Sequence, residues 1–341
     1  MKRTSLALPD AWIRQLENTV HPAEHWPLLE SAIHHQYHYN QIYREYLQFL
    51  GVVPEAIQTK EAIPFLPIQV FKNRWVMVEG KATEMVFSSS GTTGTRAARH
   101  PVASLKLYRD LAQKAFARFL GDPSDYHHLA LLPGYLERPG SSLIWMVKCF
   151  MEMAGDVPEQ HFFKHDYSKF IHQVESLRHQ NDKPLVLWGV SFALLDLADY
   201  ARPRGFTLLP EETVIETGGM KGRRREWVRQ ELHQELKDAF DAVHIASEYG
   251  MTELLSQAYA TSDGRFFPPP WMKVLVRDPT DPFHLLDYGE TGGINVIDLA
   301  NCYSCPFIAT EDLGRCFPDG SFEVLGRFDH SEMRGCSLMM A

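Results

Sequence analysis

After a short apolar stretch the chain reads Ser88-Ser89-Ser90-Gly91-Thr92-Thr93-Gly94-Thr95, and this run decides how the fold is interpreted. Its glycines allow the backbone to turn so that successive N–H groups converge on an anion. Its hydroxyl groups add hydrogen-bond donors for phosphate oxygens. The Walker pattern of phosphate-binding loops, which contains a lysine after its last glycine, is absent. Composition alone leaves two interpretations open: a phosphate-binding loop, or a flexible loop of small polar residues.

Around this loop, short apolar strands alternate with loops of small residues and with helices. We expect strands at residues 83–87, 185–188, 213–216 and 242–246. We expect helices at residues 105–119, 194–200 and 228–240, where apolar residues recur three or four positions apart. The alternation predicts βαβ units and a largely parallel sheet. Ligands bind outside the carboxyl ends of such strands, and the small, hydroxyl-rich loops fall at those ends.

The two flanks of this region have different patterns. Apolar residues from Tyr39 to Leu50 follow helical spacing, and Gly51 is expected to end that helix. Residues 63–72 contain two prolines and are expected to be extended. After the break at Pro268-Pro269-Pro270, strands are expected at residues 272–276, 293–297 and 322–325. These later strands predict a smaller, mostly β subdomain.

Length and charge exclude several classes of protein. The chain has 341 residues, of which 45% are apolar and 23% charged, as in an ordinary globular protein. Its formal net charge of -9 argues against nonspecific binding to nucleic acid or anionic lipid, which requires a basic surface. No apolar run approaches the roughly 20 residues of a membrane-spanning helix. The N-terminus lacks the long apolar region of a signal peptide, so a cytoplasmic location is expected.

The cysteines do not suggest a disulfide framework. There are five, an odd and sparse set: Cys149, Cys302, Cys305, Cys316 and Cys336. Cys302 and Cys305 form a C-x-x-C pair, and Cys316 could be a third ligand for zinc. A structural zinc site needs about four ligands, and no fourth is clearly placed. Reduced cysteines beside a strand are expected here.

Three more motifs carry chemical groups that suit a nucleotide. Residues 248–253 read Glu-Tyr-Gly-Met-Thr-Glu and offer an aromatic face, a hydroxyl group and a carboxylate for a metal ion. Residues 310–314 read Thr-Glu-Asp-Leu-Gly, and residues 326–329 read Gly-Arg-Phe-Asp. A carboxylate can accept both hydroxyls of a ribose, and an arginine can bind a phosphate in bidentate fashion. Taken singly, each motif also fits a turn, a helix start or a surface ion pair.

The order and spacing of the four motifs resemble the adenylate-forming superfamily of acyl- and aryl-CoA synthetases, luciferases and peptide-synthetase adenylation domains. Within it, the chain looks most similar to the acyl-protein synthetases of bacterial luminescence, from about Ile63 to the end. The segments that carry this resemblance are Ile63-Pro64-Phe65-Leu66-Pro67 with Phe71-Lys72, Glu216-Thr217-Gly218-Gly219-Met220-Lys221-Gly222, Asp298-Leu299-Ala300-Asn301 and Arg334-Gly335-Cys336-Ser337-Leu338.

The resemblance implies a role for each matching residue. Ser89, Ser90, Gly91, Thr92, Thr93 and Gly94 would hold the phosphates of ATP. Gly218 and Gly219 would lie along the adenine, with Tyr249, followed by Gly250 and Met251, against its face. Thr252 would touch the α-phosphate, and Glu253 would hold Mg²⁺. Asp312 would bind the ribose hydroxyls, with Arg327 nearby.

The resemblance also implies the fold and its division. The predicted fold class is α/β, with mostly parallel sheet layers flanked by helices and a small β subdomain, like the large N-terminal domain of these enzymes. The expected regions are a helical region (1–82), an α/β nucleotide- and acyl-binding region (83–265), the β subdomain (266–326) and a tail (327–341). The mobile C-terminal domain of the superfamily, which carries a catalytic lysine, has no expected counterpart.

Two kinds of residue would complete the chemistry. Lys72 and Lys221 lie in matched segments and are candidates to replace the missing lysine, although exposed surface lysines are an open alternative. Cys336 matches the cysteine that receives the acyl group, and Arg334 would favour its thiolate. Trp145, Met146, Trp188 and Phe192 are either walls of an acyl pocket or part of the core.

The resulting hypothesis is an ATP-dependent ligase that activates a carboxylic acid, expected to be a fatty acid, as an acyl-adenylate. The acyl group would then pass to a thiol, with Cys336 as the expected acceptor. One alternative passes it to coenzyme A or to a carrier-protein thiol. A second alternative is a non-catalytic nucleotide-binding subunit. An acyl reductase or acyl-carrier partner is implied by the family resemblance alone.

Overall fold

The computed structural model describes residues 9–89, 97–133, 140–180, 182–218, 227–261 and 264–328. Its helices are α1 (Pro9–Asn18), α2 (Trp26–Tyr39), α3 (Gln41–Phe49), α4 (Val70–Asn73), α5 (Leu105–Leu120), α6 (Ser142–Ala154), α7 (Pro158–His161), α8 (Tyr167–Gln180), α9 (Ser191–Ala201) and α10 (Arg229–Phe240). Its strands are β1 (Leu66–Pro67), β2 (Met85–Ser88), β3 (Arg99–Val102), β4 (His127–Leu131), β5 (Phe162–Phe163), β6 (Leu185–Gly189), β7 (Thr213–Glu216), β8 (His244–Tyr249), β9 (Ala258–Ala260), β10 (Met272–Arg277), β11 (Gly292–Asp298), β12 (Phe307–Cys316) and β13 (Phe322–Arg327). Among the described helices, none is long and apolar enough to cross a membrane.

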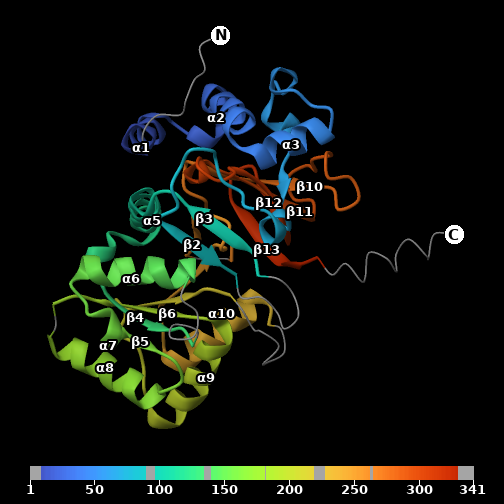
Figure 1. Cartoon of the computed structure of the whole chain (residues 1–341). Coiled ribbons are helices and arrows are strands. Elements are labelled where there is room, and N and C mark those ends of the chain that lie inside the picture. Colours follow the sequence, from blue (N-terminus) through green and yellow to red (C-terminus); the bar gives the residue numbers. More distant parts are fainter. Residues whose placement is uncertain are drawn as a thin grey trace.

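A parallel sheet forms the α/β part of the molecule, as predicted. Its strand order is β5-β4-β6-β7-β8-β9, and every pair is parallel except β8 with β9. All residues of β4 and β6 are buried, because helices cover both faces of the sheet. Figure 1 shows the sheet between α6 on one side and α8 and α9 on the other. The alternation of strands and helices read from the sequence is therefore confirmed.

The carboxyl ends of β6, β7 and β8 lie side by side. Gly189 at the end of β6 is paired with Glu216 at the end of β7, and Glu216 is paired with Ser247 of β8. The loops that follow these strands therefore start from one edge of the sheet. This edge is the predicted ligand-binding edge of the fold.

One predicted strand does not belong to this sheet. The strand expected at residues 83–87 is β2, and it pairs antiparallel with β3 in a separate hairpin, with Ser88 opposite Arg99. The prediction of a βαβ unit at this point was therefore wrong. The run Ser88–Thr95 leaves β2 and leads to β3, so it connects the two arms of a hairpin rather than a strand and a helix.

A second sheet carries the C-terminal half of the β structure. Strands β10, β11 and β12 are antiparallel neighbours, β13 pairs with β12, and the short β1 joins β12 in parallel. The N-terminal helices pack on this sheet (Figure 1). Buried side chains fix them there: Trp12 donates to the carbonyl of Leu299 at 2.8 Å, and Gln36 donates to the carbonyl of Cys302 at 2.9 Å.

Two N-terminal predictions were wrong in detail. The helix expected to run from Tyr39 to Leu50 is broken at Asn40, whose side chain caps α3 by accepting hydrogen bonds from the N–H groups of Ile42 and Tyr43. The segment expected to be extended at residues 63–72 includes only the short strand β1 and then turns into α4. Lys72 therefore lies on a helix.

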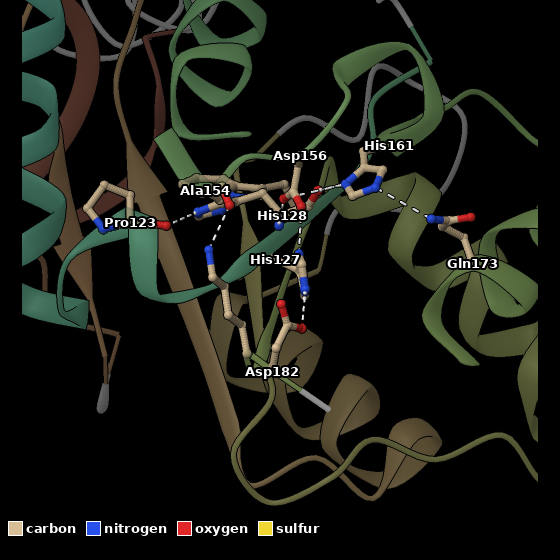
Figure 2. A network of polar contacts seen from close by, with 10 residues as sticks. Pro123, His127, His128, Ala154, Asp156, His161, Gln173 and Asp182 are labelled. Carbon is tan, nitrogen blue, oxygen red and sulfur yellow. Dashed lines mark hydrogen bonds and ion pairs between the residues drawn. The ribbon is translucent and has the colours of Figure 1, made fainter. Parts of the chain in front are cut away.

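A buried polar network closes the opposite, amino-terminal edge of the parallel sheet (Figure 2). His127, the first residue of β4, lies between two carboxylates, with Nδ1 2.5 Å from Asp156 Oδ1 and Nε2 2.8 Å from Asp182 Oδ1. The backbone N–H of His128 donates to the second oxygen of Asp156 at 2.9 Å. His161 Nδ1 lies 3.5 Å from that same oxygen. This network joins β4 to the segments before α7 and β6, far from the predicted ligand edge.

Candidate active site

The site begins at the end of β8, where Tyr249 meets two residues of the second sheet. The Tyr249 hydroxyl donates to Asp312 Oδ2 at 2.9 Å, and Arg327 Nε lies 3.3 Å from Asp312 Oδ1. Strand pairing places Asp312 directly opposite Arg327. The ring of Tyr249 packs against Phe266 and Phe322, with centroids 5.7 Å and 5.2 Å away. Three residues far apart in the chain, named from the sequence as nucleotide-binding, therefore form one contact group.

The exposure of this group differs sharply between its two charges. The Asp312 side chain is 9% exposed and the Arg327 side chain 78% exposed. Burial raises the pKa of Asp312, while Arg327 and the Tyr249 hydroxyl act in the opposite direction. An exposed ion pair contributes little to stability. The guanidinium of Arg327 is therefore available to a ligand that reaches Asp312.

Glu253 provides the carboxylate that the sequence assigned to a metal ion. The residue is 6% exposed, and burial raises its pKa to about 7. The positive charges of Arg327 and Lys72 lower that pKa and the negative charge of Asp312 raises it, so all three lie within electrostatic reach of Glu253. Oxygen ligands with a nearby phosphate suit Mg²⁺, and a bound cation favours the ionised carboxylate. The donor set therefore fits a magnesium ion delivered with a nucleotide.

Lys72 approaches the same place from α4. Its Nζ lies 3.8 Å from Glu311 Oε2, and Gln69 donates to the other oxygen of Glu311 at 2.5 Å. The Lys72 side chain is 37% exposed, so the ion pair with Glu311 is weak and can be exchanged. Lys72 thus places a positive charge within electrostatic reach of Glu253, and its catalytic role stays a prediction.

Buried side chains hold the backbone of residues 252–256. The carbonyl of Thr252 lies 2.8 Å from His100 Nδ1, and the carbonyl of Glu253 accepts from Asn301 at 2.8 Å. Asp298, at the end of β11, accepts from the N–H groups of residues 255 and 256 at 2.9 and 3.1 Å. Thr252 is half-buried and follows this fixed backbone. Asp298 and Asn301 matched the family motif in sequence, and the structure gives that motif a physical role.

The hairpin that carries the predicted phosphate loop adjoins these residues. His100 is on β3, and its contact with Thr252 brings the base of the hairpin to the site. Ser89 closes the hairpin, since its Oγ accepts from the N–H of Ala98 at 2.9 Å. The other predicted residues of this loop, Ser90, Gly91, Thr92, Thr93 and Gly94, lie outside the described residues.

Glu216 is a site residue that sequence reasoning missed. It is 2% exposed, and its carboxylate accepts from the backbone N–H of Gly218 at 2.6 Å and from the hydroxyl of Ser247 at 3.1 Å. The Ser191 hydroxyl, at the start of α9, also donates to it. Glu216 thus ties the segments that follow β6 and β7 to strand β8. The signal was an acidic residue at the end of a buried apolar strand.

Gly250 and Met251 connect Tyr249 to Thr252. A Cβ atom on Gly250 would collide with the carboxyl group of Glu248, so a larger side chain at residue 250 would displace that group. Burial and the charge of Glu216 raise the pKa of Glu248 to about 8. Met251 is partly buried against the core.

Gly218, in the segment after β7, adopts a φ of 74°, in the left-handed region that favours glycine.

The sequence comparison with known families identifies the class of enzyme. Residues 21–341 match the family described as "Acyl-protein synthetase, LuxE". The chain belongs to this family. Its members are AMP-forming ligases that activate an acid with ATP, which confirms the predicted class of enzyme and the resemblance on which it rested.

Individual proteins agree with this family assignment. The chain is 26% identical over 337 residues to a long-chain-fatty-acid–luciferin-component ligase of Vibrio harveyi, covering 92% of this chain and 86% of that protein. Its fold matches an open conformation of 2-hydroxyisobutyryl-CoA ligase in complex with 2-HIB-AMP and CoA, with a TM-score of 0.64, 14% identity, and coverage of 89% of this chain and 68% of that one. It also matches O-succinylbenzoate coenzyme A synthetase of Bacillus subtilis, in complex with ATP and magnesium ion, with a TM-score of 0.52, 18% identity, and coverage of 74% and 51%. These structures show that the chain has the adenylate-forming fold.

The remaining predicted residues divide into two groups. Gly219, Lys221 and Cys336 lie outside the described residues. Trp188, Phe192 and Met146, considered as walls of an acyl pocket, are at most 2% exposed and belong to the core. Trp145 is partly buried against the same core. Among the described residues no group of three or more His, Cys, Asp or Glu side chains is arranged to hold a metal ion, and Cys302 and Cys305 are free, buried thiols.

Proposed function

We propose that this acyl-protein synthetase activates a fatty acid as its acyl-adenylate and then transfers the acyl group to Cys336. The observation that carries the first half is the convergence of Tyr249, Asp312, Arg327, Glu253 and Lys72 at one edge of the two sheets. These residues supply an aromatic ring, a ribose-binding carboxylate, two cations and a metal-binding carboxylate. A nucleotide with its magnesium ion needs this combination of groups.

The nucleotide would lie across the ends of β7 and β8 and beside the middle of β12. Asp312 would accept the ribose hydroxyls while it keeps its bond from Tyr249, with the exposed guanidinium of Arg327 toward the phosphates. Gly218 and Gly219 would lie along the adenine, with Tyr249, Gly250 and Met251 on its other side. Ser89 through Gly94 would hold the β- and γ-phosphates.

The first chemical step would form an acyl-adenylate. A carboxylate oxygen of the acid attacks the α-phosphorus, and the bond from that phosphorus to the bridging oxygen of the β-phosphate breaks. Pyrophosphate leaves with the bonding electron pair. Glu253 would hold Mg²⁺, which neutralises the phosphates, while Thr252 and Lys72 would stabilise the charge that develops on the α-phosphate. Lys221 is a second candidate for the cationic role.

The second step would transfer the acyl group to a thiol. The thiolate of Cys336 attacks the acyl carbonyl, a thioester forms, and AMP leaves with the electron pair of the broken carbon–oxygen bond. An acyl reductase that consumes this thioester is the kind of partner this product implies. The similarity to the Vibrio harveyi ligase supports a long-chain fatty acid as the substrate.

A labelled fatty acid separates the two steps. With Mg-ATP, we expect the protein to release pyrophosphate and to retain the labelled acyl group as a hydroxylamine-sensitive adduct. Cys336→Ser should still release pyrophosphate and should lose the thioester. Cys302→Ser is the matched control, because Cys302 is buried and burial raises the pKa of its thiol well above the usual value. Labelled thioester on Cys336→Ser would rule out this acceptor, and acyl transfer only upon addition of CoA would identify a CoA ligase.

A further inference from the structure

His100 occupies the point where three parts of the proposed site meet. It lies on β3, opposite Phe87 of β2, and it is fully buried. Its Nδ1 is 2.8 Å from the carbonyl oxygen of Thr252. The ring of Phe71 packs edge-on against the imidazole, with centroids 5.7 Å apart and planes at 88°. Phe71 is the neighbour of Lys72 on α4, so the imidazole contacts the hairpin, α4 and the Thr252 segment at once.

The hydrogen bond to Thr252 determines where the imidazole carries its proton. A carbonyl oxygen only accepts, so Nδ1 must be the donor. Burial lowers the pKa of His100 to about 4, so the ring is neutral at neutral pH and carries one proton, on Nδ1. Nε2 is buried and has no hydrogen-bond partner within the described part of the chain. The polar contact of the ring is thus directed at the Thr252 carbonyl.

An unpaired nitrogen in the core is unfavourable for stability. A buried polar atom without a partner destabilises a protein by roughly 1–3 kcal/mol, so an apolar side chain of similar size would suit this site better if it only filled space. The compensating feature is the bond to Thr252. Asn301 holds the next carbonyl, that of Glu253, at 2.8 Å. Two buried side chains therefore hold the carbonyl groups of two successive peptides, those of Thr252 and Glu253.

We propose that His100 is a positioning residue for the adenylation reaction. By donating from Nδ1 to the Thr252 carbonyl, it holds Thr252 and Glu253 in the orientation that the α-phosphate and Mg²⁺ require, and it links them to the hairpin of the phosphate loop. His100 acts through the backbone and touches no reacting atom. The inference rests on the proposed function, because it assigns His100 to the same nucleotide site.

Two amide substitutions test the direction of the hydrogen bond. In His100→Asn the amide nitrogen can occupy the place of Nδ1, whereas in His100→Gln it lies near the place of Nε2. His100→Leu removes both nitrogens. Binding of Mg-ATP would be measured by calorimetry, pyrophosphate release by steady-state kinetics, and stability by urea unfolding of each variant.

We expect His100→Asn to stay within about threefold of the wild type in Mg-ATP affinity and in kcat/KM. We expect His100→Gln and His100→Leu to lose roughly tenfold or more in both, which is the loss of one well-placed hydrogen bond. The unfolding curves identify conditions in which all variants are folded. If His100 only fills space, activity should follow stability, and His100→Leu should then be at least as active as His100→Asn.

Three results would overturn the inference: unchanged binding and turnover in His100→Gln, equal losses in His100→Asn and His100→Leu, or losses that vanish once the folded fraction is corrected for. If His100→Leu does not fold, the comparison of Asn with Gln decides alone. If the wild type binds Mg-ATP but releases no pyrophosphate with any acid, the proposed function fails, and the binding data still judge His100.

Discussion

At the scale of single residues, the Tyr249 hydroxyl is the group whose removal is most informative. Tyr249→Phe keeps the ring packed against Phe266 and Phe322 but removes the donor to Asp312 at 2.9 Å. Asp312 would then lose its fixed orientation and keep only the exposed pair with Arg327. We expect the KM for ATP to rise about fivefold, because one net hydrogen bond is worth about 1 kcal/mol. Steady-state pyrophosphate release measures it, and an unchanged KM would show that Asp312 does not depend on Tyr249.

The second residue-scale prediction concerns the pH dependence of magnesium binding. Burial raises the pKa of Glu253 to about 7, and Mg²⁺ binds the ionised form. Above pH 7 the carboxylate is already ionised, whereas below it a proton must leave before the cation binds. We therefore expect the apparent Mg²⁺ affinity to fall toward tenfold per pH unit below about pH 7 and to be flat above it.

The control for this titration is Glu253→Gln, which cannot ionise. Its Mg²⁺ affinity should be weak, and the step near pH 7 should be missing. The measurement is the magnesium dependence of ATP binding between pH 5.5 and pH 8.5 in each protein. A wild-type Mg²⁺ affinity that does not change across this pH range would show that Glu253 does not bind the metal ion.

At the scale of elements, the network at the amino-terminal edge fixes β4 to its neighbours (Figure 2). Burial raises the pKa of Asp156, but its hydrogen bonds from His127, His161 and the N–H of His128 outweigh burial and lower it overall. The hydrogen bond to Asp156 is also the main reason that the pKa of His127 is raised, with Asp182 adding to it. The charged pair of His127 and Asp156 therefore stabilises the fold.

Substituting either carboxylate tests this network. Asp156→Asn should lower the free energy of unfolding by about 3 kcal/mol, because it leaves a buried ion-pair partner uncompensated. Asp182→Asn is the matched control on the other ring nitrogen. The Asp182 side chain is 54% exposed, so this substitution should lower the free energy of unfolding far less than Asp156→Asn does. Urea unfolding at pH 6 measures both, and equal losses would contradict the assigned difference in burial.

The same pair sets the direction of a pH effect. A histidine with a raised pKa contributes its full stability below the pKa of the unfolded chain and loses it as pH rises through the folded value. We expect unfolding free energy to decrease from about pH 6.5 upward through the pKa of His127. Asp156→Asn should flatten that decrease, and a wild-type curve that rises over the same interval would contradict the assignment.

Local patterns predicted the elements better than their pairing. Strand β7 matches the predicted residues 213–216, since a strand buried on both faces reads as a continuous apolar run. Strand β4 was missed because it begins with His127 and His128, which are buried only through partners elsewhere in the chain. Strand β2 was assigned to the wrong sheet, because the direction of pairing depends on contacts that no local pattern contains.

The site was predictable only where its groups stand in motifs that resemble those of the family. Tyr249, Glu253, Asp312 and Arg327 stand in motifs, and the structure brings them together. Glu216 stood in a matched segment but received no role, because its partners Ser191 and Ser247 lie on other elements. His100 was missed because it acts on the carbonyl of Thr252, which is far away in the sequence. Their importance follows from tertiary structure, in which a buried carboxylate or imidazole must find a partner.

At the scale of the whole molecule, the site depends on every part of the chain that the structure describes. Lys72 comes from the N-terminal region, His100 from the hairpin, Tyr249 from the parallel sheet and Asp312 from the second sheet. The division into regions 1–82, 83–265, 266–326 and 327–341 stays a prediction. The N-terminal helices and the segment after β11 meet through buried contacts, such as the hydrogen bond from Trp12 to the carbonyl of Leu299. A ligand at this junction should therefore stabilise the entire fold.

Mg-ATP should raise the free energy of unfolding by about 2.7 kcal/mol at a concentration 100 times its Kd, because it binds the folded state alone. Asp312→Asn should reduce this stabilisation at the same concentration, since it weakens binding to the ribose. Thermal or urea unfolding measures the stabilisation in three conditions: with Mg-ATP, with ATP and EDTA, and with Mg-GTP. Equal stabilisation by all three would indicate nonspecific binding rather than a nucleotide site.

The most direct test of the account is pyrophosphate release by the purified chain with Mg-ATP across short, long and aromatic acids, with and without CoA. The account predicts release that depends on the acid, is greatest with a long-chain fatty acid, and needs no CoA. Binding of ATP without release for any acid would contradict it and would identify the chain as a nucleotide-binding subunit without ligase activity.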